Sequence, residues 1–145
     1  RPMDRPPARF LSGCTVRTSM VSAGCVIEGT VINSVLSPGV QVREGAVVRD
    51  SVVFEDSVIG RNAVVDLAIC DKRARIGEGA VIGEGENREV PNRRFPKHLY
   101  TGITIIGKEA VLPDRARVGR NCIVNSRRLE IDFPSSGHLG DGETL

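Results

Sequence analysis

A six-residue repeat constrains the fold of this chain more than any other sequence feature. Each copy starts with an aliphatic residue and has a small residue four positions later: Ile59–Ala63, Ile76–Ala80, Ile106–Ala110, Leu112–Ala116 and Val118–Cys122. A short fixed period indicates one structural unit stacked on copies of itself, each burying its inner side chains against its neighbours. Short strands joined by small or flexible corner residues would give a three-sided parallel β-helix. The sequence therefore predicts an all-β fold.

A longer period supports the same interpretation. The segment Ser34–Val42 aligns with Ser51–Ile59 seventeen residues later, and with Ala68–Ile76 after another seventeen. An earlier copy, Ser19–Ile27, lies fifteen residues before the first. Three hexapeptides would make a coil of about eighteen residues, so one corner of each coil is expected to be shortened.

Composition agrees with a narrow aliphatic interior. Aromatic residues make up 3% of the chain and there is no Trp, whereas an ordinary globular core would use several large rings. The repeat register predicts which side chains point inward: Val42, Val48, Ile59, Val65, Ile76, Ile82, Ile106, Leu112, Val118 and Val124. Arg61, Glu78, Lys108 and Arg120 are expected to point outward.

The chain divides into three parts and one insertion. Residues 1–12 are a Pro-rich linker or lead-in, residues 13–125 form the β-helix, and residues 126–145 form a C-terminal tail. The rhythm is broken by a loop insertion over residues 84–101. Because an open coil exposes unpaired backbone, we expect this chain either to self-associate through the ends of the helix or to cover them with residues 1–12 and 126–145.

Charge and hydropathy exclude several partners. A net charge of +2 with 26% charged residues describes a solvated surface and predicts no nucleic-acid partner. No apolar run reaches the roughly 18 residues of a membrane span, and the first residues lack a signal peptide. The absence of an initiator Met suggests a piece of a longer protein. The four cysteines lack metal-site spacing, so a reducing cytoplasmic location is expected, with Cys122 as a buried structural thiol.

Few residues suggest chemistry. The glycines of Gly77–Gly83 recur at hexapeptide corners and lack the spacing of a phosphate-binding loop. With only His98 and His138, a three-histidine zinc site cannot form, so no metal site is expected. The insertion holds the densest basic cluster: Arg93, Arg94, Lys97 and His98. These four residues are the candidate anion-binding or allosteric site, because arginine forks and lysine bind phosphate well. The alternatives are a contact with an acidic surface of a neighbouring domain and a solvated insertion without a binding role.

Several segments together resemble a known family. The chain is similar to the C-terminal left-handed β-helix of glucose-1-phosphate adenylyltransferase (ADP-glucose pyrophosphorylase) over about residues 6–125. The segments that carry the resemblance are Pro6–Phe10, Ser34–Val42, Ile59–Val65, Ala68–Lys72, Arg75–Gly83 and Gly102–Ala110.

The resemblance implies a regulatory and oligomerisation domain of an enzyme that makes ADP-glucose and pyrophosphate from ATP and glucose 1-phosphate, for glycogen or starch synthesis. It implies an N-terminal catalytic domain as partner, a homo-oligomer that is typically tetrameric, and a phosphorylated metabolite as effector. Mg and ATP would bind in that other domain, so no catalytic residue is assigned here and this chain alone is expected to be inactive. The alternative is a free-standing hexapeptide-repeat acyltransferase, in which His98 would be the base and coenzyme A would bind between the coils of a trimer.

Overall fold

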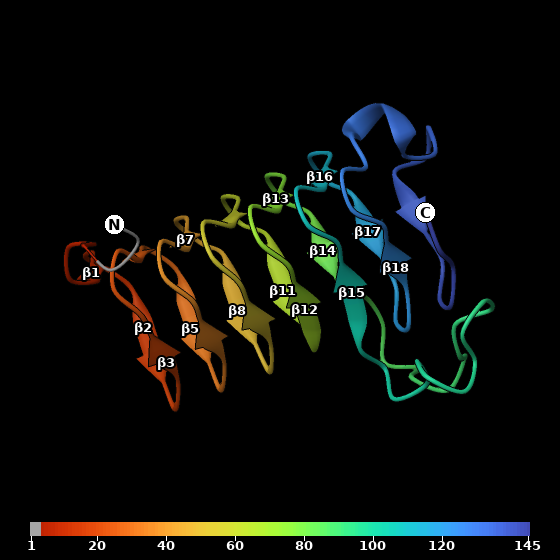
Figure 1. Ribbon diagram of the computed structural model, residues 1–145, viewed down its shortest axis with the longest axis horizontal. Helices are drawn as coiled ribbons and strands as arrows, with labels where there is room; N and C mark the ends of the chain where they lie inside the picture. The colour runs from red at the N-terminus through yellow and green to blue at the C-terminus, as the bar shows by residue number, and fades with distance from the viewer. Residues whose placement is uncertain (1–3) are drawn as a thin grey trace.

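Parallel strands wind around a single aliphatic interior in the computed structural model, which describes residues 4–145. The strands form three sheets, the faces of a triangular prism (Figure 1). The first face contains β1 (Arg9–Phe10), β4 (Val26–Ile27), β7 (Gln41–Val42), β10 (Val58–Ile59), β13 (Arg75–Ile76) and β16 (Val111–Leu112). The second face contains β2 (Thr15–Arg17), β5 (Thr30–Ile32), β8 (Val47–Arg49), β11 (Val64–Asp66), β14 (Val81–Ile82), β17 (Arg117–Val118) and β19 (His138–Leu139). The third face contains β3 (Met20–Val21), β6 (Val35–Leu36), β9 (Val52–Val53), β12 (Ala68–Cys70), β15 (Thr104–Ile106) and β18 (Ile123–Val124).

The strand register matches the periods read from the sequence. Val35 pairs with Val52 and Val52 with Ile69, while Met20 pairs with Val35. All strand pairs are parallel, and one 3-10 turn, η1 (Glu130–Asp132), accompanies them in residues 4–145. These observations confirm the predicted all-β parallel β-helix and are consistent with its left-handed form.

All ten residues predicted to point inward are buried, at 2% exposure or less. Arg61 and Glu78 are exposed, as predicted, and Lys108 is half-buried. The prediction for Arg120 is wrong, because this side chain is buried beneath the insertion.

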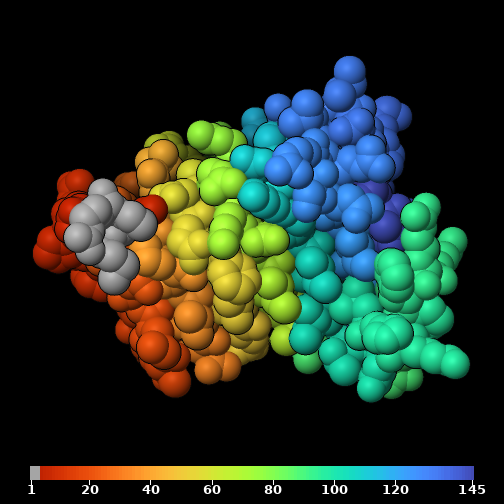
Figure 2. Space-filling model, in the orientation of Figure 1, coloured from red at the N-terminus to blue at the C-terminus, as the bar shows by residue number. Residues whose placement is uncertain are grey.

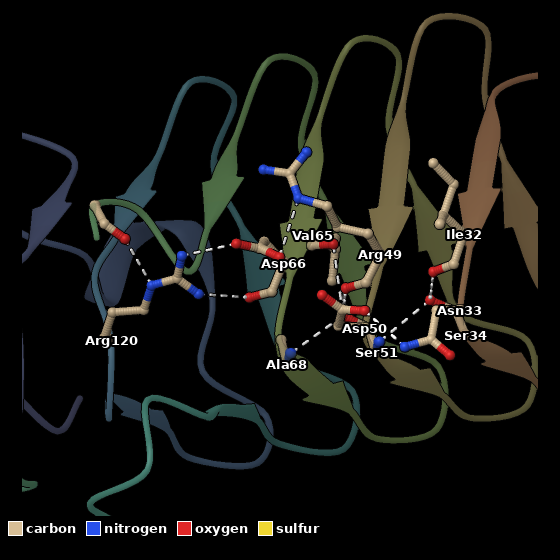
Figure 3. Close-up of polar contacts among 11 residues, drawn as sticks. Ile32, Asn33, Ser34, Arg49, Asp50, Ser51, Val65, Asp66, Ala68 and Arg120 are labelled. Atoms are coloured by element: carbon tan, nitrogen blue, oxygen red, sulfur yellow. Dashed lines mark hydrogen bonds and ion pairs between the residues drawn. The ribbon is translucent and has the colours of Figure 1, made fainter. Parts of the chain in front are cut away.

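The shortened corner lies between the second and third faces. Thr18, Asn33, Asp50 and Leu67 turn the chain there with positive φ angles of 47–51°. A tight corner interrupts the backbone ladder, and serine hydroxyls complete it: Ser34 Oγ accepts the N–H of Ser51 at 3.2 Å, and Ser51 Oγ accepts the N–H of Ala68 at 3.1 Å (Figure 3). Each hydroxyl donates in turn to the carbonyl two residues before it. Buried backbone donors are thereby satisfied at a turn too short for a strand.

The two terminal segments follow different paths. In the tail, β19 pairs with β17, and Leu139 and Phe133 join the core, so strand pairing on the second face continues beyond Asn125. The described part of the lead-in runs along the corner between the third and first faces before β1. There Arg5 forms a forked ion pair with Asp56, with N–O distances of 2.6 and 3.0 Å.

Candidate functional site

The chain leaves the β-helix after β14, forms the insertion, and rejoins the β-helix at β15. The insertion lengthens the spacing between paired residues from seventeen to thirty-six, as between Arg73 and Glu109 along one corner. The segment stands out beside the last coils (Figure 2). The coils on both sides of it keep their register, because β12 pairs directly with β15.

Two buried asparagines hold the insertion in place. Asn92 is fully buried: its amide nitrogen donates to Asn121 O and Thr144 Oγ1, both at 3.0 Å. Its side-chain oxygen accepts the backbone N–H groups of Arg94 and Phe95. Asn121, on the helix, donates to two carbonyl groups of the insertion, those of Arg88 and Val90. The insertion is therefore an ordered element of the fold.

A buried ion pair lies under the first residues of the insertion. The Nη2 of Arg120 lies 2.7 Å from Asp66 Oδ2, and the two side chains are 5% and 8% exposed (Figure 3). Arg120 Nε also donates to Gly85 O at 2.8 Å, which ties the insertion to the pair. Arg49, on the neighbouring coil, contacts the other oxygen of Asp66 at 3.1 Å. The insertion removes Arg120 from solvent, and this explains why the repeat register mispredicted it.

These residues line a hollow of about 400 Å³ between the second face and the insertion, together with Glu86 and Arg88 of the insertion. Three arginines and three carboxylates line it, so their formal charges cancel. The hollow therefore lacks the charge excess that would select an anion or a cation.

The predicted basic cluster is only partly gathered. Arg93, Arg94, Lys97 and His98 are all exposed. Arg93 and Arg94 line a second hollow, of about 330 Å³, together with Glu143 and Thr144 of the tail. The backbone N–H of Arg93 donates to Gly142 O, which fixes the first arginine against the tail. Lys97 and His98 do not line this hollow.

The buried thiols are structural. Burial raises the pKa of Cys70 to about 12 and that of Cys122 to about 11, so neither is a thiolate near neutral pH. Cys122 lies in a small-residue corner position, as predicted, and its Sγ lies 3.0 Å from Gly140 O. Within residues 4–145 no group of His, Cys, Asp or Glu has the arrangement of a metal site, and no helix is long and apolar enough to cross a membrane.

Sequence reasoning missed the polar residues that anchor the insertion: Asp66, Asn92, Arg120 and Asn121. One signal was available, because Arg49 and Asp66 are seventeen residues apart and the register places them side by side. The hydrogen bonds of Asn92 and Asn121 join the insertion to the β-helix and the tail, and no repeat period relates the residues at their two ends.

Comparison with known proteins places this architecture in a family. The family model described as "GlmU-like, C-terminal hexapeptide" matches residues 6–106. The chain belongs to this family of C-terminal hexapeptide-repeat domains.

Its curated relatives are more specific. The chain is 50% identical to the glucose-1-phosphate adenylyltransferase of Thermomicrobium roseum, over 100% of this chain and 34% of the relative. It is 42% identical to the enzyme of the same name from Acetivibrio thermocellus, over 89% of this chain and 30% of the relative. The chain thus spans about a third of the length of these relatives and matches a C-terminal region of them.

Solved structures show the fold alone. The acetyltransferase domain of PglB from Neisseria gonorrhoeae matches 97% of this chain, with a TM-score of 0.55 and 19% identity. The match covers 50% of that domain. The same domain in complex with acetyl coenzyme A gives a TM-score of 0.57 and 20% identity. At this identity the similarity shows a shared architecture and supports no inference about activity.

Proposed function

We propose that this chain is the C-terminal regulatory and assembly domain of a glucose-1-phosphate adenylyltransferase. The observation that carries the proposal is the 50% identity over the whole chain to one third of such an enzyme. The parent enzyme would join ATP and glucose 1-phosphate into ADP-glucose and pyrophosphate. That chemistry, with its Mg and ATP, would belong to the remaining two thirds, and this chain alone would be inactive.

The regulatory part of the proposal rests on the insertion. Arg93 and Arg94 present two guanidinium groups beside one hollow, and a phosphorylated metabolite could accept forked hydrogen bonds from them. Lys97 lies further along the same exposed segment and would add positive charge to the approach of an anion, and His98 beside it could donate a hydrogen bond. Glu143 in the same hollow opposes an anion, so the ligand would need contacts from beyond this domain.

The test uses the full-length enzyme with Arg93, Arg94 and Lys97 changed to Ala. A matched control changes three exposed arginines outside the insertion, Arg17, Arg75 and Arg128, to Ala. We expect the first variant to lose at least about tenfold in effector affinity while keeping its activity without effector, since a charged hydrogen bond contributes roughly 1.5–3 kcal/mol. The control should respond like the parent.

Two results would contradict the proposal at different levels. If the full-length protein makes no ADP-glucose, the assignment to the adenylyltransferase reaction fails. If it does, and the triple variant matches the parent in activation and assembly, the regulatory site fails. We also propose a homo-oligomer, with four subunits as the expected number, and a cytoplasmic location. Ultracentrifugation of the full-length enzyme tests the subunit number.

A further inference from the structure

One face of the prism has an outward surface unlike the other two. On the third face, the outward residue of every described strand is apolar, in an unbroken column: Met20, Val35, Val52, Ile69, Ile105 and Ile123. The strands that carry them form one continuous row along the helix (Figure 1). Met20 is 70% exposed and Val35 40%, while the other four side chains are half-buried.

The other two faces supply an internal comparison. The first face interrupts its outward column with Arg9, Gln41 and Arg75, and the second face carries Arg17, Arg49, Asp66, Arg117 and His138. Strands with one solvated face normally alternate apolar inward and polar outward residues. An unbroken apolar column on both sides of a sheet is typical of a sheet that is covered on both sides.

The corner between the second and third faces also carries an apolar residue where a polar one or Gly is usual. Positive φ angles favour Asn, Asp or Gly, and Asn33 and Asp50 fill this corner in the two preceding coils, after Thr18 in the first. In the next coil the residue is Leu67, at φ 51°, although a Leu gains no local hydrogen bond there. Leu67 lines a shallow hollow of about 380 Å³ with Val35 and Val52. The strained position therefore extends the apolar surface.

The size of the face indicates what kind of partner covers it. Six strands about 4.8 Å apart, each presenting about 12 Å of width, offer roughly 300 Å². A pair of such surfaces buries about 600 Å² in total, below the roughly 1,200–2,000 Å² of stable complexes between separate proteins. It lies at the lower limit of the range of about 600–1,500 Å² for contacts between domains of one chain, where tethering supplies the effective concentration.

The lead-in runs beside the same face. Gly24 N–H donates to Pro6 O at 2.6 Å, and Arg5 crosses Gly39 to reach Asp56. A Cβ at Gly39 would collide with the guanidinium of Arg5, so this glycine leaves room for the crossing. Gly24, Gly39 and Asp56 are corner residues that border the third face. The segment before β1, which contains Arg5 and Pro6, therefore runs along one edge of this face.

We infer that the third face is the docking surface for the domain that makes up the rest of the chain in its relatives. This inference rests on the proposed function, and it adds which face is covered and by what. The partner surface is flat and apolar, and it seats on Val52 and Ile69 at the middle of the column. A second copy of this chain is the competing occupant.

Photo-crosslinking of the full-length protein tests this directly. A benzophenone side chain replaces Val52 in one variant and Val58 in another. Val58 is the matched control, because it points outward at half-buried exposure from the first face of the same coil. We expect position 52 to give a crosslink within one chain, to residues outside this domain, at a yield at least about fivefold above position 58.

Other outcomes overturn the inference. A product of doubled mass joining two copies through position 52 assigns the face to a subunit interface. Equal yields at both positions, or a reading frame that adds no further domain, leave the face without the proposed partner. The readout does not depend on ADP-glucose synthesis, so a protein that docks correctly and lacks this activity refutes only the proposed function. A second pair of variants, Val52→Lys and Val58→Lys, places a charge on the third or the first face. Protease cleavage of the segment that joins the two domains should be about tenfold faster in V52K than in V58K, because only V52K weakens the contact between the domains.

Discussion

Arg120 is the residue whose position most changes the interpretation of this chain. The repeat register assigns it to solvent, yet its guanidinium binds Asp66 and Gly85 O at the base of the insertion. A buried ion pair gains little over a well-packed apolar pair, because both ions lose their hydration. Removing Arg120 has a large cost, because the buried Asp66 carboxylate then keeps only the half-exposed Arg49 as its ion-pair partner.

Changing Arg120 to Ala should therefore lower the free energy of unfolding by at most about 3–5 kcal/mol, the cost of a buried charge with no partner at all. Changing Arg117 to Ala is the control, since Arg117 also pairs with a carboxylate, Glu84, but is 63% exposed. The exposed pair should contribute about 0–1 kcal/mol. Urea unfolding of the full chain measures both variants, and similar losses for the two would contradict the buried role of Arg120.

At the scale of the elements, the insertion is a loop that the helix holds through side-chain amides. Asn92 alone makes four hydrogen bonds, which form a turn over residues 92–95 and join the loop to Asn121 and Thr144. Most of the loop's other side chains are exposed, so few apolar contacts support its conformation. Its order depends on these amides, and so does the spacing of Arg93 and Arg94.

Replacing Asn92 with Ala should release the loop while leaving the coils intact. The expected result is trypsin cleavage after Arg93 or Arg94 that is at least about tenfold faster, because local opening no longer breaks buried hydrogen bonds. Asn87→Ala is the control: Asn87 is exposed and its side chain accepts one bond, from Glu89 N–H. Unchanged cleavage in N92A, together with unchanged strand content by circular dichroism, would show that the loop is held by other contacts.

At the scale of the whole molecule, charges of alternating sign follow the corner between the third and first faces. Arg5 pairs with Asp56, and Arg73 pairs with Glu109, which also contacts Arg127. The hydrogen bond from Arg5 lowers the pKa of Asp56, and that from Arg73 lowers the pKa of Glu109. Folding therefore favours the ionised carboxylates, and the unfolded chain binds protons more readily in acid.

The stability that these carboxylates contribute is complete above their ordinary pKa values of 3.8 and 4.5, and is lost as the pH falls through the lowered values. We expect the thermal midpoint to fall as the pH decreases from 5 to 3, and to fall less in the double variant D56N/E109Q. E86Q, which changes an exposed loop carboxylate, should follow the parent. Equal acid sensitivity in parent and double variant would contradict the contribution of this corner, and added salt should reduce the difference.

The sequence alone determined the coils, because a β-helix repeats one local rule and each inward residue contacts its counterparts one period away. The positions of Val48, Ile59, Ile82 and Val118 follow from that rule, and so does the neighbourhood of Arg49 and Asp66. Only the tertiary structure decided the contacts between residues that are not one repeat period apart. The pairing of Arg120 with Asp66, the asparagines that hold the insertion, and the separation of Arg93 and Arg94 from Lys97 and His98 all depend on where an aperiodic segment folds back onto the helix.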